Sequence, residues 1–341
     1  MSGSCVTWAI LGCGVFARKR LLPAFAKVSH AKLLALQRRN LAEAQATARE
    51  AGVPRAYATR EELLADADIQ AVFIATPNNL HLEDVRAAVA AGKHVLVEKP
   101  MGVSASECQR MIVAAQAAGV KLFVGHCFRY THAVEQSRAL LLSGQLGALR
   151  GVRCWYGFLI PATAWRKDSR ISGGGPLLDL GPHALDFFRY VTGAEFAEAA
   201  AFVSPDSDPA TGQCEEEARA LLKFRSGATA VLELSFREHF RNGFEITGAC
   251  GSLRGDFTLN QIVNENVRLL RLTSDPTPPR TEEIPLQHRE VYGAQIDDVS
   301  RALLDPAHRP MCATGADGLA TLQAIEAIYL AGRTGQRARV M

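Results

Sequence analysis

Residues 6–17 of the 341-residue chain read VTWAILGCGVFA and decide the fold of its first part. The first six residues form an apolar run typical of a buried parallel strand, and the next six fit the pattern G-x-G-x-x-A. Gly12 permits a tight turn, Gly14 lets a pyrophosphate approach the backbone, and Ala17 allows close packing between strand and helix. The stretch therefore indicates a dinucleotide-binding turn, unless it is only a packing turn in another doubly wound sheet.

The same alternation of strand and helix patterns continues through the first third of the chain. Three alanine-rich helical patterns each end at a glycine, Gly52, Gly92 or Gly119, which can adopt the left-handed conformation that ends a helix. This order predicts parallel βαβ units, so we expect residues 1–125 to form a Rossmann domain. The predicted strands are 6–11, 32–37, 71–75, 94–98 and 121–125, and the predicted helices are 41–51, 80–91 and 104–118.

The pattern changes after about residue 126. Later stretches alternate apolar and polar residues, as in 232–237, with the period of a strand that has one solvated face. We therefore expect residues 126–341 to form an α+β domain with a mainly antiparallel sheet, which binds substrate. Within it we predict helices at 131–143 and 316–332, strands near 151–158, 218–224, 244–247 and 267–272, a hairpin turn at 225–227 and a proline-rich loop at 275–280.

Composition excludes several classes of protein. Hydrophobic residues make up 48% and charged residues 21% of the chain, as in globular domains and unlike disordered or collagen-like chains. The 38 basic and 35 acidic residues give a net charge of only +3 without a basic stripe, so we expect no nucleic-acid partner. No apolar stretch reaches the roughly 20 residues of a membrane helix. The eight dispersed cysteines lack metal-type spacing, so we expect no metal, and they suit the reducing cytoplasm.

Arg38 and Arg39 follow the second predicted strand, where an enzyme that uses NAD normally carries an acidic residue. Two guanidinium groups could pair with the 2′-phosphate of NADP, and no carboxylate is present to repel it. A charged hydrogen bond of this kind contributes about 1.5–3 kcal/mol, or roughly 10- to 150-fold in affinity. We therefore predict a preference for NADP(H), with NAD(H) as the other candidate. The alternative is that both arginines only solvate the strand end.

Lys99 follows the fourth predicted strand, in Glu98-Lys99-Pro100. It therefore lies at the carboxyl end of a parallel strand, where open α/β sheets bind ligands. Its apolar neighbours could desolvate the amine and lower its pKa towards the range of acid–base catalysis. The alternative is an ordinary solvated lysine.

A glycine-rich segment, GGGPLLDLGPH at residues 173–183, places Asp179 and His183 four residues apart at the start of a predicted helix. Pro182 is tolerated only in the first turn of a helix, so it fixes where this helix begins. His183 could exchange a proton with a hydroxyl near neutral pH, and Asp179 could orient the imidazole. The alternative is a capping aspartate and a core histidine. Because Lys99 and His183 fall in different predicted domains, we expect the active site in the cleft between these domains.

These strings together resemble the Gfo/Idh/MocA oxidoreductases, the glucose-fructose oxidoreductase and inositol dehydrogenase group, over nearly the whole chain. The resemblance rests on the glycine turn at 12–17, ATPNNLH at 75–81, AGKHVLVEKP at 91–100 and the glycine-rich segment at 173–183. It implies a Rossmann domain followed by a domain with a large open sheet, which commonly forms a homodimer or homotetramer interface.

The resemblance also implies catalytic roles for three residues. Lys99, Asp179 and His183 correspond to the family's catalytic positions, with His183 as the proton acceptor or donor, Lys99 bonded to the reacting oxygen and Asp179 holding the geometry. The resemblance further implies that the nicotinamide side is lined by Thr76, Pro77, Asn79, His81 and Glu98. With the glycine turn and the two arginines predicted above, the cofactor-binding set is Gly12, Gly14, Val15, Phe16, Arg38, Arg39, Thr76, Pro77, Asn79, His81, Glu98, Lys99, Trp165 and Arg166.

Two further positions complete the predicted site. Trp165 and Arg166 resemble a Trp-Arg pair that some NADP-using sugar reductases of the family place near cofactor and substrate. Tyr292 either closes the substrate site or is a packing residue. The predicted substrate contacts are Lys99, Arg166, Asp179, His183 and Tyr292.

The sequence thus predicts a cytoplasmic NADP(H)-dependent oxidoreductase that interconverts a secondary alcohol and a ketone on a sugar or polyol by hydride transfer. Two alternatives stay open. One is a sugar-responsive regulator that binds a dinucleotide without turnover, and the other is an enzyme for a non-sugar substrate such as a dihydrodiol. Neither nucleic acid nor membrane is an expected partner.

Overall fold

The computed structural model describes residues 5–161, 164–205, 208, 210–256, 269–274 and 278–341. It divides into two compact units, Met1–Cys127 with Glu290–Leu319 and Phe128–Arg289 with Ala320–Met341. In the described part of the chain, no helix combines the length and apolar character needed to cross a membrane. The assignment of cofactor and substrate binding to separate domains stays a prediction.

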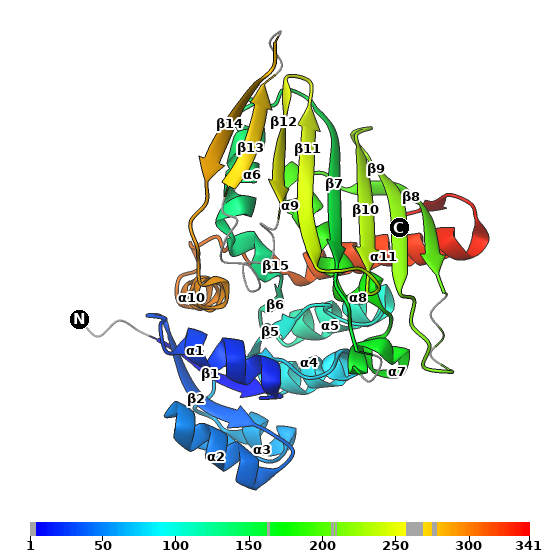
Figure 1. The fold of residues 1–341 in the computed structure, drawn as a ribbon. Coiled ribbons are helices and arrows are strands. Elements are labelled where there is room, and N and C mark those ends of the chain that lie inside the picture. Colours follow the sequence, from blue (N-terminus) through cyan, green and yellow to red (C-terminus); the bar gives the residue numbers. More distant parts are fainter. Residues whose placement is uncertain (1–4, 162–163, 206–207, 209, 257–268, 275–277) are drawn as a thin grey trace. The chain divides into compact units, whose positions relative to one another are not determined.

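The first unit is built on a seven-stranded sheet in the order β15-β6-β5-β4-β1-β2-β3 (Figure 1). All neighbouring strands run parallel except β15, which pairs antiparallel with β6 at the edge. The order of β1 to β6 is that of a Rossmann sheet, so the predicted fold class of this unit is confirmed. The strands are β1 (Val6–Leu11), β2 (Ala31–Gln37), β3 (Arg55–Tyr57), β4 (Ala71–Ile74), β5 (His94–Glu98), β6 (Leu122–Gly125) and β15 (Ala313–Thr314).

The helices of this unit end where the sequence predicts. Gly52, Gly92 and Gly119 have φ angles of +66°, +72° and +67°, the left-handed conformation that a glycine adopts without strain. The short β3 and α3 were not predicted, because three and six residues are too few to show a periodicity. The helices are η1 (Ala17–Leu21, a π-helix), α1 (Leu22–Phe25), α2 (Leu41–Ala51), α3 (Arg60–Ala65), η2 (Asn78–Leu80, a 3-10 helix), α4 (His81–Ala90), α5 (Ala105–Ala117) and α10 (Val291–Leu304).

The second unit contains a nine-stranded sheet in the order β14-β13-β12-β11-β7-β10-β9-β8-β16. Among the strands that the structure describes in this unit, only β7 and β10 are parallel neighbours, which confirms the predicted mainly antiparallel sheet. The strands are β7 (Leu149–Gly157), β8 (Phe196–Ser204), β9 (Glu217–Phe224), β10 (Thr229–Ser235), β11 (Arg241–Gly248), β12 (Gly251–Asp256), β13 (Leu269–Ser274), β14 (Arg280–Pro285) and β16 (Ala338–Arg339).

Some predicted features of this unit fall partly outside the described residues. The strand expected at 267–272 is described from Leu269, and of the loop expected at 275–280 only residues 278–280 are described, with Arg280 already in β14. The sequence pattern missed β8, β12, β14 and the two-residue β16.

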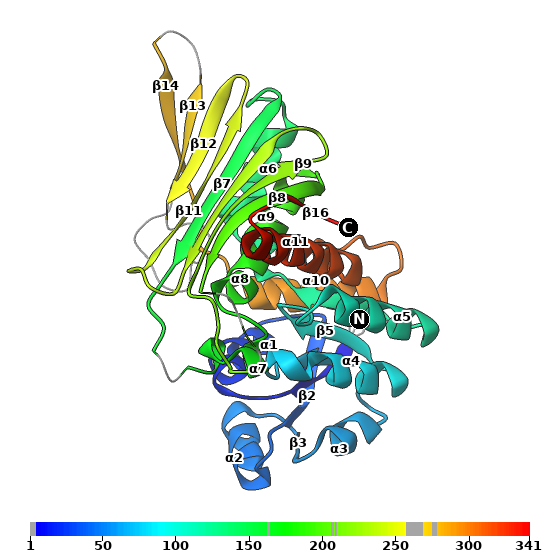
Figure 2. The same cartoon turned by 90° about the vertical axis from the view of Figure 1, so that its right-hand side faces the viewer.

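Helices cover one face of the nine-stranded sheet. α8 (Pro176–Asp179) packs on β9 and β10, α9 (Gly181–Thr192) packs on β7 and β10, and α6 (His132–Leu142) packs on α9. Figure 2 shows these helices along one side of the sheet, and no described helix of this unit lies on the opposite side. The unit therefore has a large open sheet face. The long α11 (Gly315–Thr334) begins in the first unit and continues into the second.

A buried ion pair joins residues 128–130 to α9. The Nε of Arg129 donates to Oδ2 of Asp186 at 2.9 Å, and Nη2 donates to Oδ1 at 2.6 Å. The two side chains are only 7% and 2% exposed. The guanidinium also lies 4.7 Å from the ring centroid of Tyr190, one turn further along α9.

Replacing Asp186 with alanine should destabilise the protein strongly, because Arg129 would keep a buried charge without its carboxylate. We expect the Asp186→Ala variant to lose about 3–5 kcal/mol of the free energy of unfolding, measured by urea denaturation.

The matched control is Arg337→Ala, which removes an exposed ion pair of the same unit. Arg337 is 74% exposed and lies 3.3 Å from Glu198. It should change the free energy of unfolding by less than about 1 kcal/mol. Equal effects of the two variants would show that burial does not set the contribution of the Arg129 pair.

Candidate functional site

The backbone of the glycine turn is sterically restricted at Gly12 and exposed at Gly14. Gly12 has a φ of +85°, and a Cβ there would lie 2.7 Å from Cγ2 of Thr76, so no other residue fits. The amide of Gly12 donates to Oε1 of Gln37 at 3.2 Å, and Nε2 of Gln37 donates to the carbonyl of Ala58 at 2.7 Å. A Cβ on Gly14 would meet nothing within 4 Å. The exposed backbone at Gly14 therefore fits the close approach of a pyrophosphate.

Phe16 and Tyr292 pack together in the first unit. Their ring centroids are 5.5 Å apart with planes at 74°, and Tyr292 is buried at the start of α10. Burial raises the pKa of Tyr292 well above its ordinary value, and the neighbouring Cys127 adds to this shift. Val15, the residue before Phe16, is 60% exposed. Besides packing on Phe16, the hydroxyl of Tyr292 is hydrogen-bonded to the side chain of Cys127, and the role of Tyr292 at a substrate stays a prediction.

Arg38 and Arg39 differ in their surroundings. Arg38 donates from Nη1 to Oγ1 of Thr47 at 2.8 Å and pairs through Nη2 with the carboxylate of Glu43, both on α2. Arg39, the next residue, is exposed and precedes α2. Of the two predicted 2′-phosphate ligands, Arg38 is thus already paired with the protein and Arg39 faces solvent.

His81 connects the segments that follow β4 and β5. Its ring is fully buried, with Nδ1 at 2.9 Å from the carbonyl oxygen of Pro100 and Nε2 at 3.0 Å from that of Thr76. Burial lowers the pKa of His81, although the two carbonyl contacts act against this shift. The neutral imidazole has one N–H, so it donates to one of the two carbonyls at a time. His81 therefore holds the Lys99–Pro100 segment, whose peptide bond is cis, beside Thr76.

Glu98 has an unusual environment next to Lys99. Its Oε2 accepts from the Lys99 amide at 3.2 Å, whereas its buried Oε1 has no hydrogen-bond partner among the described residues. A Cβ on Gly125 would lie 3.2 Å from this carboxylate, so the glycine leaves room for it. Burial raises the pKa of Glu98 to about 7, against the opposing charge of Lys99. Of the other predicted cofactor contacts nearby, Pro77 and Asn79 are exposed.

In the second unit, the glycine-rich segment forms the four-residue α8 and the start of the twelve-residue α9, where the sequence predicts one helix. Asp179 is the last residue of α8, and His183 lies in the first turn of α9. The break falls at Leu180, because Pro182 cannot continue a helix but fits the first turn of a new one. The register of His183 agrees with the prediction, whereas Asp179 belongs to a separate turn.

Three predicted residues of this unit come together. Nε of Arg166 lies 3.4 Å from Oδ2 of Asp179, and the guanidinium lies 5.0 Å from the ring centroid of Trp165. The site residues are thus divided between the units. Lys99, Glu98 and Tyr292 belong to the first unit, and Trp165, Arg166, Asp179 and His183 belong to the second.

Sequence reasoning missed the residue that holds the glycine-rich segment. The buried carboxylate of Glu215 accepts from the amides of Gly175 at 2.8 Å and Leu177 at 2.9 Å, and from the hydroxyl of Tyr329 at 2.9 Å. A Cβ on Gly175 would lie 1.9 Å from the carbonyl oxygen of Glu215. Three consecutive glutamates at 215–217 resemble a solvated surface, so the sequence carries no local signal for this contact.

Phe128 is a second missed residue. Its ring is stacked on the imidazole of His183, with centroids 4.1 Å apart and planes at 15°. The two residues are 55 positions apart in the sequence, and no pattern connects them.

Comparison with known proteins identifies both parts of the chain. Residues 6–126 match the family described as "Oxidoreductase family, NAD-binding Rossmann fold", and residues 134–254 match the "GFO/IDH/MocA C-terminal domain". An aldose-aldose oxidoreductase from Caulobacter crescentus, crystallised with glycerol, is 32% identical with a TM-score of 0.88, over 98% of this chain and 99% of that one.

Two curated relatives cover nearly the whole chain, and a third covers 72% of it. A 1,5-anhydro-D-fructose reductase of Ensifer adhaerens is 30% identical over 336 residues, 98% of each chain. A D-xylose 1-dehydrogenase (NADP(+)) of Haloferax volcanii is 30% identical over 345 residues, 96% of this chain and 98% of that one. A mouse trans-1,2-dihydrobenzene-1,2-diol dehydrogenase is 31% identical over 72% of both chains. This chain therefore belongs to the Gfo/Idh/MocA family and is an NAD(P)-dependent oxidoreductase.

Proposed function

We propose that this protein is an NADP(H)-dependent oxidoreductase that interconverts a secondary alcohol and a ketone on a sugar or polyol. The observation that supports the substrate class is the ion pair between Arg166 and Asp179 at the end of α8. Asp179 lies four residues before His183 in the sequence. Such a group of donors and acceptors suits a ligand with several hydroxyls. The names of the anhydrofructose, xylose and aldose relatives support the same class.

The proposed roles follow from the chemistry of the side chains. His183 exchanges a proton with the reacting hydroxyl, and Lys99 donates a hydrogen bond to the same oxygen. Asp179 orients the Arg166 guanidinium, with which it already pairs. When bound, the nicotinamide accepts or supplies the hydride.

The proposed cofactor contacts lie in the first unit. The turn at Gly12 and Gly14 binds the pyrophosphate, and Arg39 binds the 2′-phosphate. Glu98 lies on the nicotinamide side, where its buried Oε1 offers a hydrogen-bond acceptor that the described residues leave unused. Because a buried acceptor without a donor is costly, this oxygen favours a bound ligand that carries an N–H group.

The Arg39→Ala variant tests the NADP preference. We expect its KM for NADP to rise by roughly 10- to 150-fold, the value of one charged hydrogen bond, while its KM for NAD stays unchanged. Initial rates with each cofactor give both constants. Arg49→Ala, at an exposed arginine of α2, is the matched control and should change neither KM. A wild-type enzyme that prefers NAD would contradict the proposal.

The His183→Ala variant tests the proton route and the activity together. NADPH oxidation with keto-sugars such as 1,5-anhydro-D-fructose, and NADP reduction with aldoses and cyclitols, should identify a substrate for the wild-type protein. The variant should then lose about 10²- to 10⁴-fold in kcat with an unchanged Kd for NADPH.

The outcomes of this assay separate the alternatives. His288→Ala, at an exposed histidine of the same unit, is the control and should keep full activity. Turnover of a dihydrodiol but of no sugar would make the protein a non-sugar enzyme. NADPH binding without turnover of any carbonyl compound would favour a regulator.

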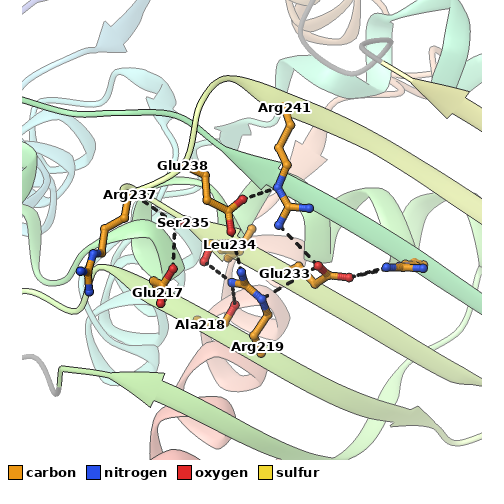
Figure 3. A network of polar contacts seen from close by, with 10 residues as sticks. Glu217, Ala218, Arg219, Glu233, Leu234, Ser235, Arg237, Glu238 and Arg241 are labelled. Carbon is orange, nitrogen blue, oxygen red and sulfur yellow. Dashed lines mark hydrogen bonds and ion pairs between the residues drawn. The ribbon is translucent and has the colours of Figure 1, made fainter.

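We also propose that the open sheet face of the second unit binds a second copy of this chain. The side chain of Leu234 faces Gly181 of α9, so the neighbouring Glu233 points to the open face. On this face, Oε1 of Glu233 accepts a hydrogen bond from Nη2 of Arg153 at 2.8 Å. Burial raises the pKa of Glu233, but Arg153 and the other nearby arginines outweigh this effect, so the pKa is lowered. Figure 3 shows how this network continues across β9, β10 and β11.

An aromatic residue lies within the same charged network. Trp155 has the guanidinium groups of Arg153 and Arg254 at 5.6 Å and 5.0 Å from its ring centroid. Tryptophan and arginine are enriched in protein interfaces, and charges already paired within one copy cost less to bury against another.

The Trp155→Ala variant tests this interface. We expect the wild-type protein to sediment as a dimer or tetramer and the variant to dissociate at micromolar concentration, because interface tryptophans often contribute about 2 kcal/mol or more. Leu142→Ala, which removes an exposed apolar side chain of α6, should leave the assembly intact. A monomeric wild-type protein would contradict the proposal.

A further inference from the structure

We propose that Phe128 is a positioning residue for the imidazole of His183, and that the buried pair of Arg129 and Asp186 holds Phe128 in this place. The inference rests on the proposed role of His183 as the proton carrier. It concerns residues of the second unit only.

The stacked contact restricts the orientation of the imidazole. Rotation of a histidine ring about its Cβ–Cγ bond has broad preferences, so the backbone of α9 alone does not fix the ring plane. The centroids of the Phe128 and His183 rings are 4.1 Å apart and their planes differ by 15°. At this distance, the imidazole fits only when its plane is nearly parallel to that of the phenyl ring. Phe128 is 6% exposed and lies against Tyr156 of β7 at 6.4 Å, so it cannot move aside freely.

The next residue fixes the position of Phe128 along α9. Arg129 binds Asp186, three residues after His183, and lies over Tyr190, seven residues after His183. Positions separated by three and seven residues share one face of a helix. Phe128 and Arg129 therefore contact one stripe of α9 in a single register, with the phenyl ring at His183.

This arrangement matters because proton transfer depends on where the imidazole nitrogen points. A displacement of about 1 Å in a reacting group can lower a rate by about 10²-fold. The stack lies on the ring face, whereas both nitrogens lie at the edge of the ring and are not covered by it. The proposed effect is thus on the orientation of His183 and not on cofactor binding.

The test compares Phe128→Leu with Phe224→Leu. The control residue, Phe224 of β9, is also buried and stacks on Phe196 of β8, with ring centroids 4.7 Å apart and planes at 19°. It has no role in the proposed site. Both variants should lower the urea midpoint of unfolding. Only Phe128→Leu should also lower kcat, by roughly 10- to 100-fold, with the Kd for NADPH unchanged. Phe128→Tyr keeps the ring and should retain most of the activity.

A spectroscopic measurement gives a readout that does not depend on turnover. The ring current of a stacked phenyl group shifts the Hε1 proton of His183 upfield, and this resonance can be assigned by its loss in His183→Asn. It should move downfield in Phe128→Leu and stay in place in Phe224→Leu. Phe128→Met, whose flexible side chain adapts more readily to the space left by the ring, replaces the leucine variant if that variant does not fold.

The results separate this inference from the proposed function. An unchanged His183 resonance, or equal losses of kcat in Phe128→Leu and Phe224→Leu, would overturn the positioning role alone. Full turnover in His183→Ala would overturn the proposed proton route, whatever the resonance shows.

Discussion

The ion pair between Arg129 and Asp186 is the interaction on which the candidate site of the second unit depends. Both charges lie almost out of reach of water, and each compensates the burial of the other. Such a pair adds little net stability compared with two apolar side chains, but it permits only one register. Its consequence is therefore positional, because it brings Phe128 to His183 each time the chain folds.

In the first unit the corresponding constraint is steric. Gly12 approaches Thr76 so closely that a Cβ would collide with it, and the carbonyl of Thr76 contacts His81. The other nitrogen of His81 contacts the carbonyl of Pro100, directly after Lys99. The glycine turn and the lysine segment are thus connected through two backbone carbonyls and one buried ring. A side chain at position 12 would disturb the lysine as well as the cofactor turn.

Local signals explain which parts of the structure could be predicted from the sequence. Strand and helix periods, and the glycines that end helices, act within a few residues of one another, so they predict the Rossmann sheet well. Pro182 likewise predicts the start of α9, whereas the four-residue α8 is too short to show a pattern. The contacts that hold the site join distant residues. Glu215 binds the amide of Gly175 across 40 positions, and charge alone does not indicate that it is buried.

The two arginines after β2 show why the number of charges does not determine a preference for NADP. Arg38 already pairs with Glu43, so a 2′-phosphate must displace that carboxylate to bind both guanidinium groups. The side chain of Glu43 is 56% exposed, and an exposed pair of this kind contributes about 0–1 kcal/mol. A charged hydrogen bond to phosphate contributes about 1.5–3 kcal/mol. Under the proposed binding of NADP, the exchange favours the phosphate, and Glu43 is the partner of Arg38 in the free protein.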